Sequence, residues 1–244
     1  MLAAPPAPPC DVQIGRSVRG VAICAQRLGD PGAKRVALVV GSMHGDEPGG
    51  MAVVRRLRAR RASIRGVQLW VIDRINPDGL ARGTRTNARG VDLNRNFPEG
   101  WRASGSRGSR FFPGPRPASE PETRAVQRFI RRIRPDVSVW LHQPYGFVVL
   151  PDRRGASTTV QRRYARVAGI AARRRGGPPL TGTAIAWSNR RVGGTAFVAE
   201  LPGGPVAPGL ARRHVRAILA VARDQPGSTT SSPRPGERPL GGRR

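Results

Sequence analysis

Residues 35–47 read RVALVVGSMHGDE, and this stretch decides the fold class. Residues 35–40 form a short apolar run rich in β-branched side chains, which is typical of a strand buried on both faces of a sheet. The run ends at a glycine, and over residues 48–61 apolar side chains recur at three-residue spacing between arginines, which is a helical pattern. A strand, a loop and a helix in this order form the unit of a parallel α/β sheet.

Strand and helix patterns alternate along the rest of the chain. Apolar runs predict strands at residues 18–28, 67–72, 137–141 and 195–201. Helical periodicity predicts helices at residues 119–133, with Ser119 as the cap, and at 156–174 and 210–221. Between them, residues 76–117 begin with the turn-rich sequence NPDG and are expected to form a long functional loop. This order predicts an α/β protein with a largely parallel sheet, which binds its ligand at the carboxyl ends of the strands.

Length and composition indicate one domain of the size typical of enzymes. The 244 residues are 38% hydrophobic, which is enough to fill a sizeable core. We expect a proline-rich N-terminal segment at residues 1–11, a catalytic domain at 12–223 and a disordered basic tail at 224–244, where Pro, Gly, Ser and Arg predominate. No run of apolar residues approaches the length of a membrane span.

The formal net charge of +28 is typical of proteins that bind nucleic acid or another anionic surface. The arginines, however, are scattered through almost every segment and only 5% of residues are aromatic, whereas a nucleic-acid groove needs clustered basic residues interleaved with aromatic ones. We interpret the charge as a preference for arginine over lysine, since Lys34 is the only lysine, and expect no specific nucleic-acid partner. The positive charge is also compatible with a location next to an anionic polymer such as cell-wall material.

The cysteines and the N-terminus leave the compartment open. Cys10 and Cys24 are the only two cysteines, so a single bridge is the most that they can form, and no spacing rule decides whether they pair. The first ten residues lack the basic start and the apolar run of a signal peptide. The chain as written is expected to be cytoplasmic, or secreted if a start further upstream carries a signal peptide. The sequence does not determine the oligomeric state.

Two histidines and a carboxylate follow strands of the predicted sheet. His44 and Glu47 come directly after the strand at residues 35–40, and His142 closes the strand at 137–141, so all three are expected at the carboxyl edge. Two histidines and one carboxylate are typical of a catalytic zinc site that keeps a fourth position for water. His-x-x-Glu alone also fits a loop histidine and a helix-initiating glutamate without a metal, so the hypothesis depends on His142. The remaining histidine, His214, lies in a predicted helix without ligand companions and is interpreted as structural or solvated.

Glu200 is the candidate for the proton-transfer group of such a site. It ends an otherwise apolar strand, where a charged side chain is costly unless it faces a cleft. A zinc hydrolase usually needs a separate carboxylate that accepts and returns a proton. In the long loop, Arg95 has the fork geometry that binds a substrate carboxylate with two hydrogen bonds, and Arg85 has the charge to stabilise an oxyanion.

The motifs in this order resemble the zinc carboxypeptidase family, and specifically its bacterial branch of murein peptide amidases, over residues 12–222. The matching pieces are HGDE at 44–47, NPDG at 76–79, TRTNARGVDLNRNFP at 84–98, SEPET at 119–123, LHQP at 141–144 and AELP at 199–202. The resemblance implies a three-layer α/β/α sandwich around a mixed, largely parallel sheet of about eight strands. It also implies one zinc ion per chain and the following roles: His44, Glu47 and His142 as zinc ligands, Glu200 as general base, Arg85 as carbonyl polariser, and Asn94 with Arg95 as the clamp on the substrate's terminal carboxylate.

The sequence departs from the family pattern at two places. Digestive-type members carry an arginine immediately before the zinc glutamate, where this chain has Asp46, as the amidase-like branch tends to have. The family's mobile active-site tyrosine has no equivalent near residues 182–187, and the nearest place is held by Pro178 and Pro179. Both departures favour small peptides over ordinary protein C-termini as substrates.

The expected function is therefore zinc-dependent hydrolysis of a peptide or γ-glutamyl amide bond beside a carboxylate-bearing residue. The γ-D-glutamyl to diaminopimelate bond of cell-wall peptides is one such bond. An alternative enzyme is an N-acyl amino acid deacylase of the succinylglutamate desuccinylase and aspartoacylase type, although the intact NPDG and DLNRNFP motifs favour the peptidase branch. A second alternative is a non-catalytic protein that binds an anionic polymer, which would have little reason to keep Glu200 at a strand end.

Overall fold

The computed structural model describes residues 10–151 and 157–223. Most of the segment expected at residues 1–11 and the whole tail expected at 224–244 lie outside the described residues, so the three domain boundaries stay predictions. The strands are β1 Val12–Arg16, β2 Ala22–Gly29, β3 Val36–Val40, β4 Gln68–Ile72, β5 Val137–His142, β6 Phe147–Leu150, β7 Ala171–Arg174 and β8 Thr195–Glu200. The α-helices are α1 Gly50–Arg58, α2 Pro77–Arg82, α3 Pro121–Ile133, α4 Thr159–Ala168, α5 Ala184–Arg191 and α6 Pro208–Arg223, and the 3₁₀ helices are η1 Arg61–Ser63 and η2 Leu93–Arg95.

The strands form one eight-stranded mixed sheet in the order β1-β2-β4-β3-β5-β8-β6-β7. The pairs β3–β4, β3–β5, β5–β8 and β6–β7 are parallel, and the pairs β1–β2, β2–β4 and β6–β8 are antiparallel. The four central strands β4, β3, β5 and β8 therefore run in one direction. This arrangement confirms the expected mixed, largely parallel sheet.

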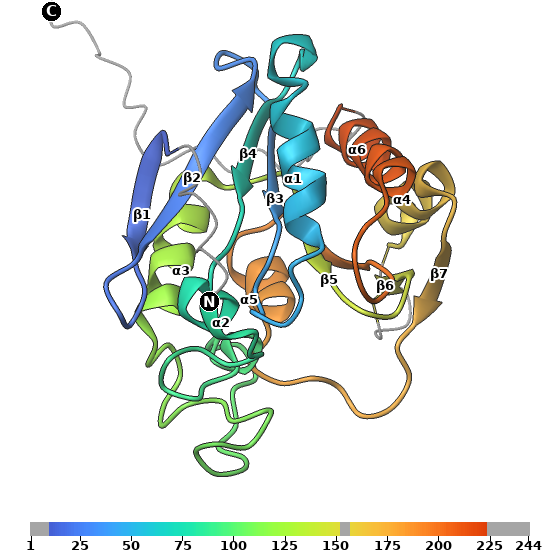
Figure 1. Ribbon diagram of the computed structural model, residues 1–244. Coiled ribbons are helices and arrows are strands. Elements are labelled where there is room, and N and C mark those ends of the chain that lie inside the picture. The colour runs from blue at the N-terminus through green and yellow to red at the C-terminus, as the bar shows by residue number, and fades with distance from the viewer. Residues whose placement is uncertain (1–9, 152–156, 224–244) are drawn as a thin grey trace, which may run out of the picture.

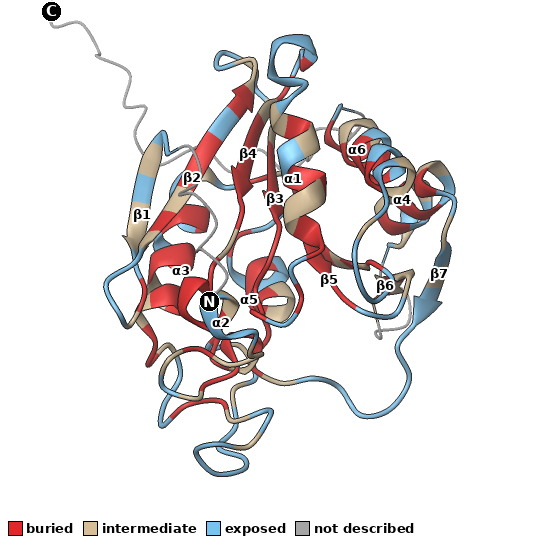
Figure 2. Ribbon diagram, in the orientation of Figure 1, coloured by how far each residue is buried: buried red, intermediate tan, exposed pale blue. Residues whose placement is uncertain are grey.

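Helices cover both faces of the sheet, as Figure 1 shows for α1, α4 and α6 on one side and α3 and α5 on the other. Alternate residues of each central strand contribute to different cores. Val39 belongs to the core beneath α1, α4 and α6, whereas its neighbours Leu38 and Val40 belong to the core beneath α3 and α5. The central strands are accordingly buried on both faces (Figure 2). The three layers are those of the expected α/β/α sandwich.

Several elements differ from the prediction because turns interrupt the patterns. The strand predicted at 18–28 is wrong at its start: the chain turns at residues 17–20, with Gly20 at φ +80°, and β1 pairs with β2 as a hairpin. The helix predicted at 156–174 ends at Ala168, because Gly169 adopts a left-handed conformation as the C-cap, and strand β7 follows. Four further elements were not predicted from the sequence, namely β1, β6, β7 and α5.

The long loop predicted at 76–117 contains two short helices. Asn76 caps α2 by accepting a hydrogen bond from the Gly79 amide at 2.8 Å, and Pro77 occupies the first turn, so NPDG begins a helix and not a turn. The cap of α3 is Glu120 and not Ser119. The Ser119 hydroxyl instead donates a hydrogen bond to the Glu120 carboxylate at 2.7 Å.

A disulfide joins Cys10 to Cys24 on β2, which answers the question of pairing that the sequence left open. Among the described residues, no helix combines the length and apolar character that a membrane crossing requires.

Candidate metal centre and active site

The carboxyl ends of β3, β5 and β8 meet at one edge of the sheet, where the segment between β4 and α3 also gathers (Figure 1). His44 lies in the loop after β3. His142 is the last residue of β5 and Glu200 is the last residue of β8, and the two are paired in register across the parallel strands. The sheet therefore places an imidazole and a carboxylate side by side at the edge where ligands bind in such folds.

Three buried side chains converge in front of this edge. Nδ1 of His44 lies 3.0 Å from Oε1 of Glu47, and Nδ1 of His142 lies 2.7 Å from Oε2 of the same carboxylate. The candidate ligand atoms of His44, Glu47 and His142 all lie within 4.8 Å of one another. The structure thus brings together the three residues that the sequence predicted as zinc ligands.

A close approach of two backbones shapes the loop that carries His44. A Cβ atom on Gly45 would lie 2.0 Å from the carbonyl carbon of Gly79 in α2, so only glycine fits there. The Gly45 amide also donates to the carbonyl of Thr84 at 3.0 Å. The HGDE loop is therefore held against the start of the NPDG helix, and this contact requires glycine at position 45. At Gly79 a Cβ atom would instead lie 2.2 Å from the side-chain nitrogen of Asn76.

Asp92 orients His44, and it is the functional residue that sequence reasoning missed. Its Oδ1 lies 3.0 Å from Nε2 of His44, and because an ionised carboxylate has no proton to donate, Nε2 must carry the hydrogen. A neutral His44 then presents the Nδ1 lone pair toward Glu47 and His142. Carboxylate–histidine pairs of this kind are typical of metal sites. Asp92 lies within the DLNRNFP motif, but nothing in the local sequence indicates its contact with His44, which is 48 residues away.

The donor set fits a zinc ion. Nδ1 of His44 is buried and makes no hydrogen bond with any described residue, despite its short contact with Glu47. Two imidazole nitrogens and one carboxylate are the protein ligands of hydrolytic zinc sites. His44, Glu47 and His142 would hold the ion.

The protonation states agree with such a site. Burial alone would raise the pKa of Glu47, but contacts with His142 and His44 hold it well below its usual range, and Asp92 behaves in the same way because of His44 and Arg85. Burial lowers the pKa of His142, partly opposed by Glu47. Burial also favours neutral His44, yet the two neighbouring carboxylates raise its pKa. Both acids are thus ionised, which suits residues that surround a cation.

Glu200 has the properties of a proton acceptor. Burial, together with the negative charge of Glu47, raises the pKa of Glu200 to about 7. Its Oε2 atom is buried and has no hydrogen-bond partner among the described residues, while the backbone of Tyr145 partly opposes the rise in the pKa of the carboxyl. A carboxylate with a free oxygen and a pKa near neutrality can take up and release a proton at physiological pH.

Arg85 joins the carboxylates of the site. Its Nη1 donates to Oε1 of Glu47 and its Nε donates to Oδ2 of Asp92, both at 3.0 Å. The guanidinium is therefore fixed beside the candidate metal ligands. Of the two arginines predicted as functional, Arg85 is the one that contacts this cluster directly.

Asn94 and Arg95 follow Asp92 on η2. The amide oxygen of Asn94 accepts a hydrogen bond from the backbone N–H of Ala184 at 3.0 Å, which ties η2 to the start of α5. The Arg95 guanidinium lies 5.4 Å from the centre of the Phe111 ring, on which Arg85 also stacks at 5.2 Å. Arg95 is partly buried, so its pKa is lowered by desolvation, although the nearby Asp92 opposes this effect. The predicted carboxylate clamp thus lies next to Arg85.

His214 is remote from this cluster. It is fully buried between α6 and α4, where its Nδ1 lies 2.7 Å from the hydroxyl of Tyr164. His214 therefore has a structural position in the core and is not solvated, so of the two interpretations of this residue the structural one is confirmed.

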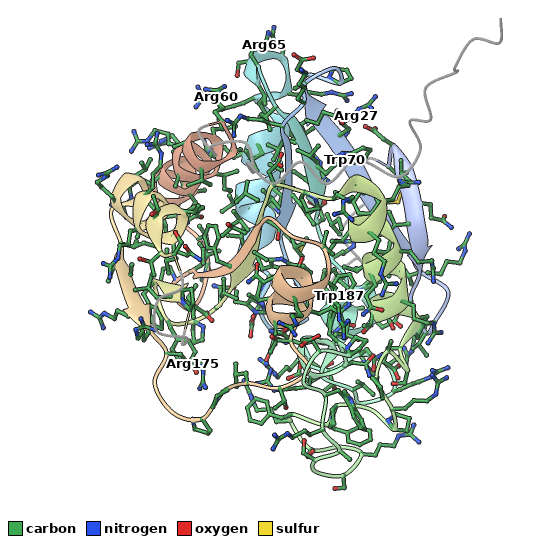
Figure 3. The ribbon with its side chains drawn as sticks, turned by 180° about the vertical axis from the view of Figure 1, so that it is seen from behind. Arg27, Arg60, Arg65, Trp70, Arg175 and Trp187 are labelled. Carbon is green, nitrogen blue, oxygen red and sulfur yellow. A yellow bond between two sulfur atoms is a disulfide. The ribbon has the colours of Figure 1, made fainter. Side chains whose placement is uncertain are left out.

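Pro178 and Pro179, which stand where the family has its mobile tyrosine, are exposed on the segment after β7, on which Figure 3 also places Arg175.

Comparison with known proteins connects this geometry to a family. Residues 11–174 match the model of the family described as zinc carboxypeptidase. The chain is 35% identical to murein peptide amidase A of Escherichia coli K12 over 157 residues, a match that covers 59% of this chain and 63% of that protein. It is 36% identical to murein peptide amidase A of Vibrio campbellii over 123 residues, covering 46% and 49%. The matched stretch thus spans less than two thirds of the length of these relatives.

Solved structures agree with this result. A murein-tripeptide amidase from Escherichia coli O157 superposes with a TM-score of 0.69 at 28% identity, covering 90% of this chain and 94% of that one. A carboxypeptidase A from Helicoverpa armigera superposes with a TM-score of 0.75 at 19% identity, covering 87% and 68%, and shows the likeness of fold alone. The family match covers most of this chain and includes His44, Glu47 and His142. This chain therefore belongs to the zinc carboxypeptidase family.

Proposed function

We propose that this protein is a zinc-dependent amidase that hydrolyses the γ-D-glutamyl to diaminopimelate bond of small cell-wall peptides. The observation that carries the proposal is the free, buried Oε2 of Glu200 beside the buried cluster of His44, Glu47 and His142. The likeness to the two murein peptide amidases and to the murein-tripeptide amidase supports this choice of bond.

Proton transfer is the task of Glu200 in this proposal. Zinc held by His44, Glu47 and His142 would lower the pKa of water and polarise the substrate carbonyl. Glu200 accepts the proton that water loses when it attacks the amide carbon, and returns it to the departing amine. The raised pKa of Glu200 supports this role, because a group that both accepts and donates works best near the operating pH.

Charge stabilisation and substrate orientation are the tasks of the arginines. Arg85 stabilises the negative charge that develops on the carbonyl oxygen, and its hydrogen bonds to Glu47 and Asp92 keep it in place before the substrate arrives. Arg95 and Asn94 bind the terminal carboxylate of the leaving residue, for which the planar guanidinium is well shaped. Diaminopimelate carries such a carboxylate.

The test compares zinc-loaded wild-type protein with Glu200→Gln on a tripeptide that ends in γ-D-glutamyl-diaminopimelate and on ordinary peptides with free C-termini. Mass spectrometry follows the released residue. We expect hydrolysis of the tripeptide, and a loss of about 10²- to 10⁴-fold in Glu200→Gln with an unchanged zinc content, because this range is typical for removal of a general base.

Glu99→Gln is the matched control, because Glu99 pairs with Arg191 at 3.1 Å on the surface. It should keep wild-type activity. Full activity of Glu200→Gln would overturn the mechanism. Hydrolysis of N-acyl amino acids without hydrolysis of the tripeptide would instead assign the protein to the deacylase alternative.

A further inference from the structure

A cavity of about 670 Å³ opens beside the candidate metal ligands. It lies between α1 and the segment at residues 203–206 that leads from β8 to α6. Its lining includes Asp46, Glu47, Arg55, Arg110 and Gln143. A volume in this range suits a ligand the size of a dipeptide.

The walls of this cavity are held in place by Gln143. Its side-chain oxygen accepts a hydrogen bond from the Gly49 amide at 2.7 Å, and its side-chain nitrogen donates to the carbonyls of Pro202 at 2.7 Å and Gly204 at 2.8 Å. Gln143 is buried, and it immediately follows the candidate ligand His142. One side chain thus links the start of α1 to the opposite wall, so the cavity is formed before a ligand enters.

The position of the cavity decides which part of a substrate it can receive. Arg85, Asn94 and Arg95 are absent from its lining. In the proposed function these residues bind the leaving residue and the reacting carbonyl. The cavity borders Glu47 and is not lined by the carboxylate clamp, so it is available to the acyl portion of the substrate, on the other side of the bond that is cut.

The charges of the lining are mixed, which is unusual in so basic a chain. Glu47 is committed to the candidate metal site, so Asp46 is the acidic side chain of the lining that is available to a ligand. Asp46 meets Arg110 at 3.8 Å, and the side chains are 29% and 64% exposed. A contact this long and exposed contributes little stability and leaves both groups accessible. Arg55 adds a second basic group to the same lining.

We infer that this cavity is the binding subsite for the acyl portion of the substrate, and that Asp46 binds a free amino group there while Arg110 binds a free carboxylate. The inference rests on the proposed function. A γ-linked glutamyl residue keeps its α-carboxylate, and a dipeptide that ends with it also has an N-terminal ammonium group. The mixed lining complements this pair of charges, so the subsite selects short peptides with a free amino terminus over peptides whose amino terminus is acylated.

A binding experiment tests the subsite independently of hydrolysis. L-Alanyl-D-glutamate and its N-acetyl derivative are titrated into zinc-loaded protein by calorimetry or NMR. We expect wild-type protein to bind the free amine about fivefold to tenfold more tightly, which corresponds to about 1 kcal/mol. Asp46→Asn should bring this ratio close to one. Arg110→Gln should weaken both probes alike, because both carry the carboxylate.

Asp30→Asn is the matched control, because Asp30 lies in the turn after β2, where its side chain accepts a hydrogen bond from Gly32. This variant should keep the wild-type ratio. A ratio near one in wild-type protein, or a ratio that persists in Asp46→Asn, would overturn the inference.

Hydrolysis of the tripeptide with a free or an acetylated amino terminus separates the two proposals. We expect Asp46→Asn to lower kcat/KM for the free tripeptide to the level of the acetylated one. If no tripeptide is cut but dipeptide binding still depends on Asp46, the proposed reaction is wrong and the subsite stands. If the tripeptide is cut and neither binding nor rate depends on Asp46, the subsite is wrong and the reaction stands.

Discussion

The Nε2 atom of His44 lies 3.0 Å from Oδ1 of Asp92, and this contact directs the Nδ1 atom of His44 toward Glu47 and His142. The same carboxylate holds Arg85 through its other oxygen. Asp92 therefore connects a candidate metal ligand to the residue proposed to stabilise the oxyanion, although it is not itself one of the three candidate ligands.

Asp92→Asn should weaken zinc binding. The amide carries no charge and can present its NH₂ group to His44, which disfavours the tautomer with a free Nδ1. We expect an affinity loss of about 10- to 100-fold, as is typical when such a partner of a metal-binding histidine is removed. Competition with a chelator measures this loss, with Asp30→Asn as the control. Wild-type affinity in Asp92→Asn would show that His44 needs no orientation or is not a ligand.

His142→Ala should abolish stoichiometric zinc binding. We expect about one zinc per chain in wild-type protein and much less in the variant, because two ligands of a three-ligand site hold the ion poorly. Elemental analysis of dialysed protein measures the content. His214→Gln changes the buried histidine that lies outside the candidate metal site, and this variant should keep its zinc. An unchanged zinc content in His142→Ala would remove the proposed ligand set.

Phe111→Ala should impair substrate binding more than folding. The ring is 51% exposed and lies over the guanidinium groups of Arg85 and Arg95 at 5.2 and 5.4 Å. Each such contact contributes about 0.5 to 1 kcal/mol at an exposed site, so kcat/KM should fall by about fivefold to 30-fold. Phe111→Tyr should restore it because the ring is kept. An equal loss in both variants would show that stacking is irrelevant.

Stability should fall between neutral and mildly acidic pH because of His214. Burial lowers its pKa to about 4 from an ordinary value of 6.5, and nearby Arg213 acts in the same direction. Between pH 6.5 and pH 4, His214 is protonated in the unfolded chain but neutral in the folded chain. The contribution of His214 to the free energy of unfolding is therefore largest above pH 6.5 and decreases as the pH falls toward 4. The contribution amounts to about 3 kcal/mol.

Denaturant unfolding at pH 7.5 and pH 4.5 measures this effect in wild-type protein and in His214→Gln. The variant cannot take up the proton, so the difference between the two pH values should be smaller by about 2 to 3 kcal/mol. A pH dependence identical to that of wild-type protein would show that His214 does not titrate in this range on unfolding.

Reduction of the Cys10–Cys24 disulfide should destabilise the protein without changing its active site. The bridge closes a loop with a sequence separation of 14 residues, and a loop of this size contributes about 3 kcal/mol in the chain-entropy description. Unfolding with and without reductant measures the loss, and a double Cys10→Ser, Cys24→Ser variant should reproduce it. If reduction leaves the unfolding midpoint unchanged, the cysteines are not paired in solution.

The predictable part of the fold lies where the local pattern and the tertiary environment agree. The strand at 36–40 is buried on both faces and is continuously apolar, so its pattern is visible without its neighbours. By contrast, β7 has the sequence AARR and is largely exposed. A short edge strand of this kind forms only because β6 supplies its hydrogen bonds, so its sequence carries no period that identifies it.

The candidate site also has a part that the sequence predicts and a part that it does not. His44, Glu47, His142 and Glu200 are foreseeable because each follows or ends a predicted strand, and parallel strands deliver their carboxyl ends to one edge. The role of Asp92 is not foreseeable, since it depends on a contact across 48 residues that forms only when η2 folds over the loop after β3.

The sequence by itself therefore determined the α/β class, the edge of the sheet that carries the candidate site and the four residues His44, Glu47, His142 and Glu200 that were expected there, because strand burial and strand direction leave local patterns. Only the tertiary structure decided the tautomer of His44, the pairing of the cysteines and the cavity at Asp46. These three depend on distances between segments far apart in the chain, and short-range patterns do not encode such distances.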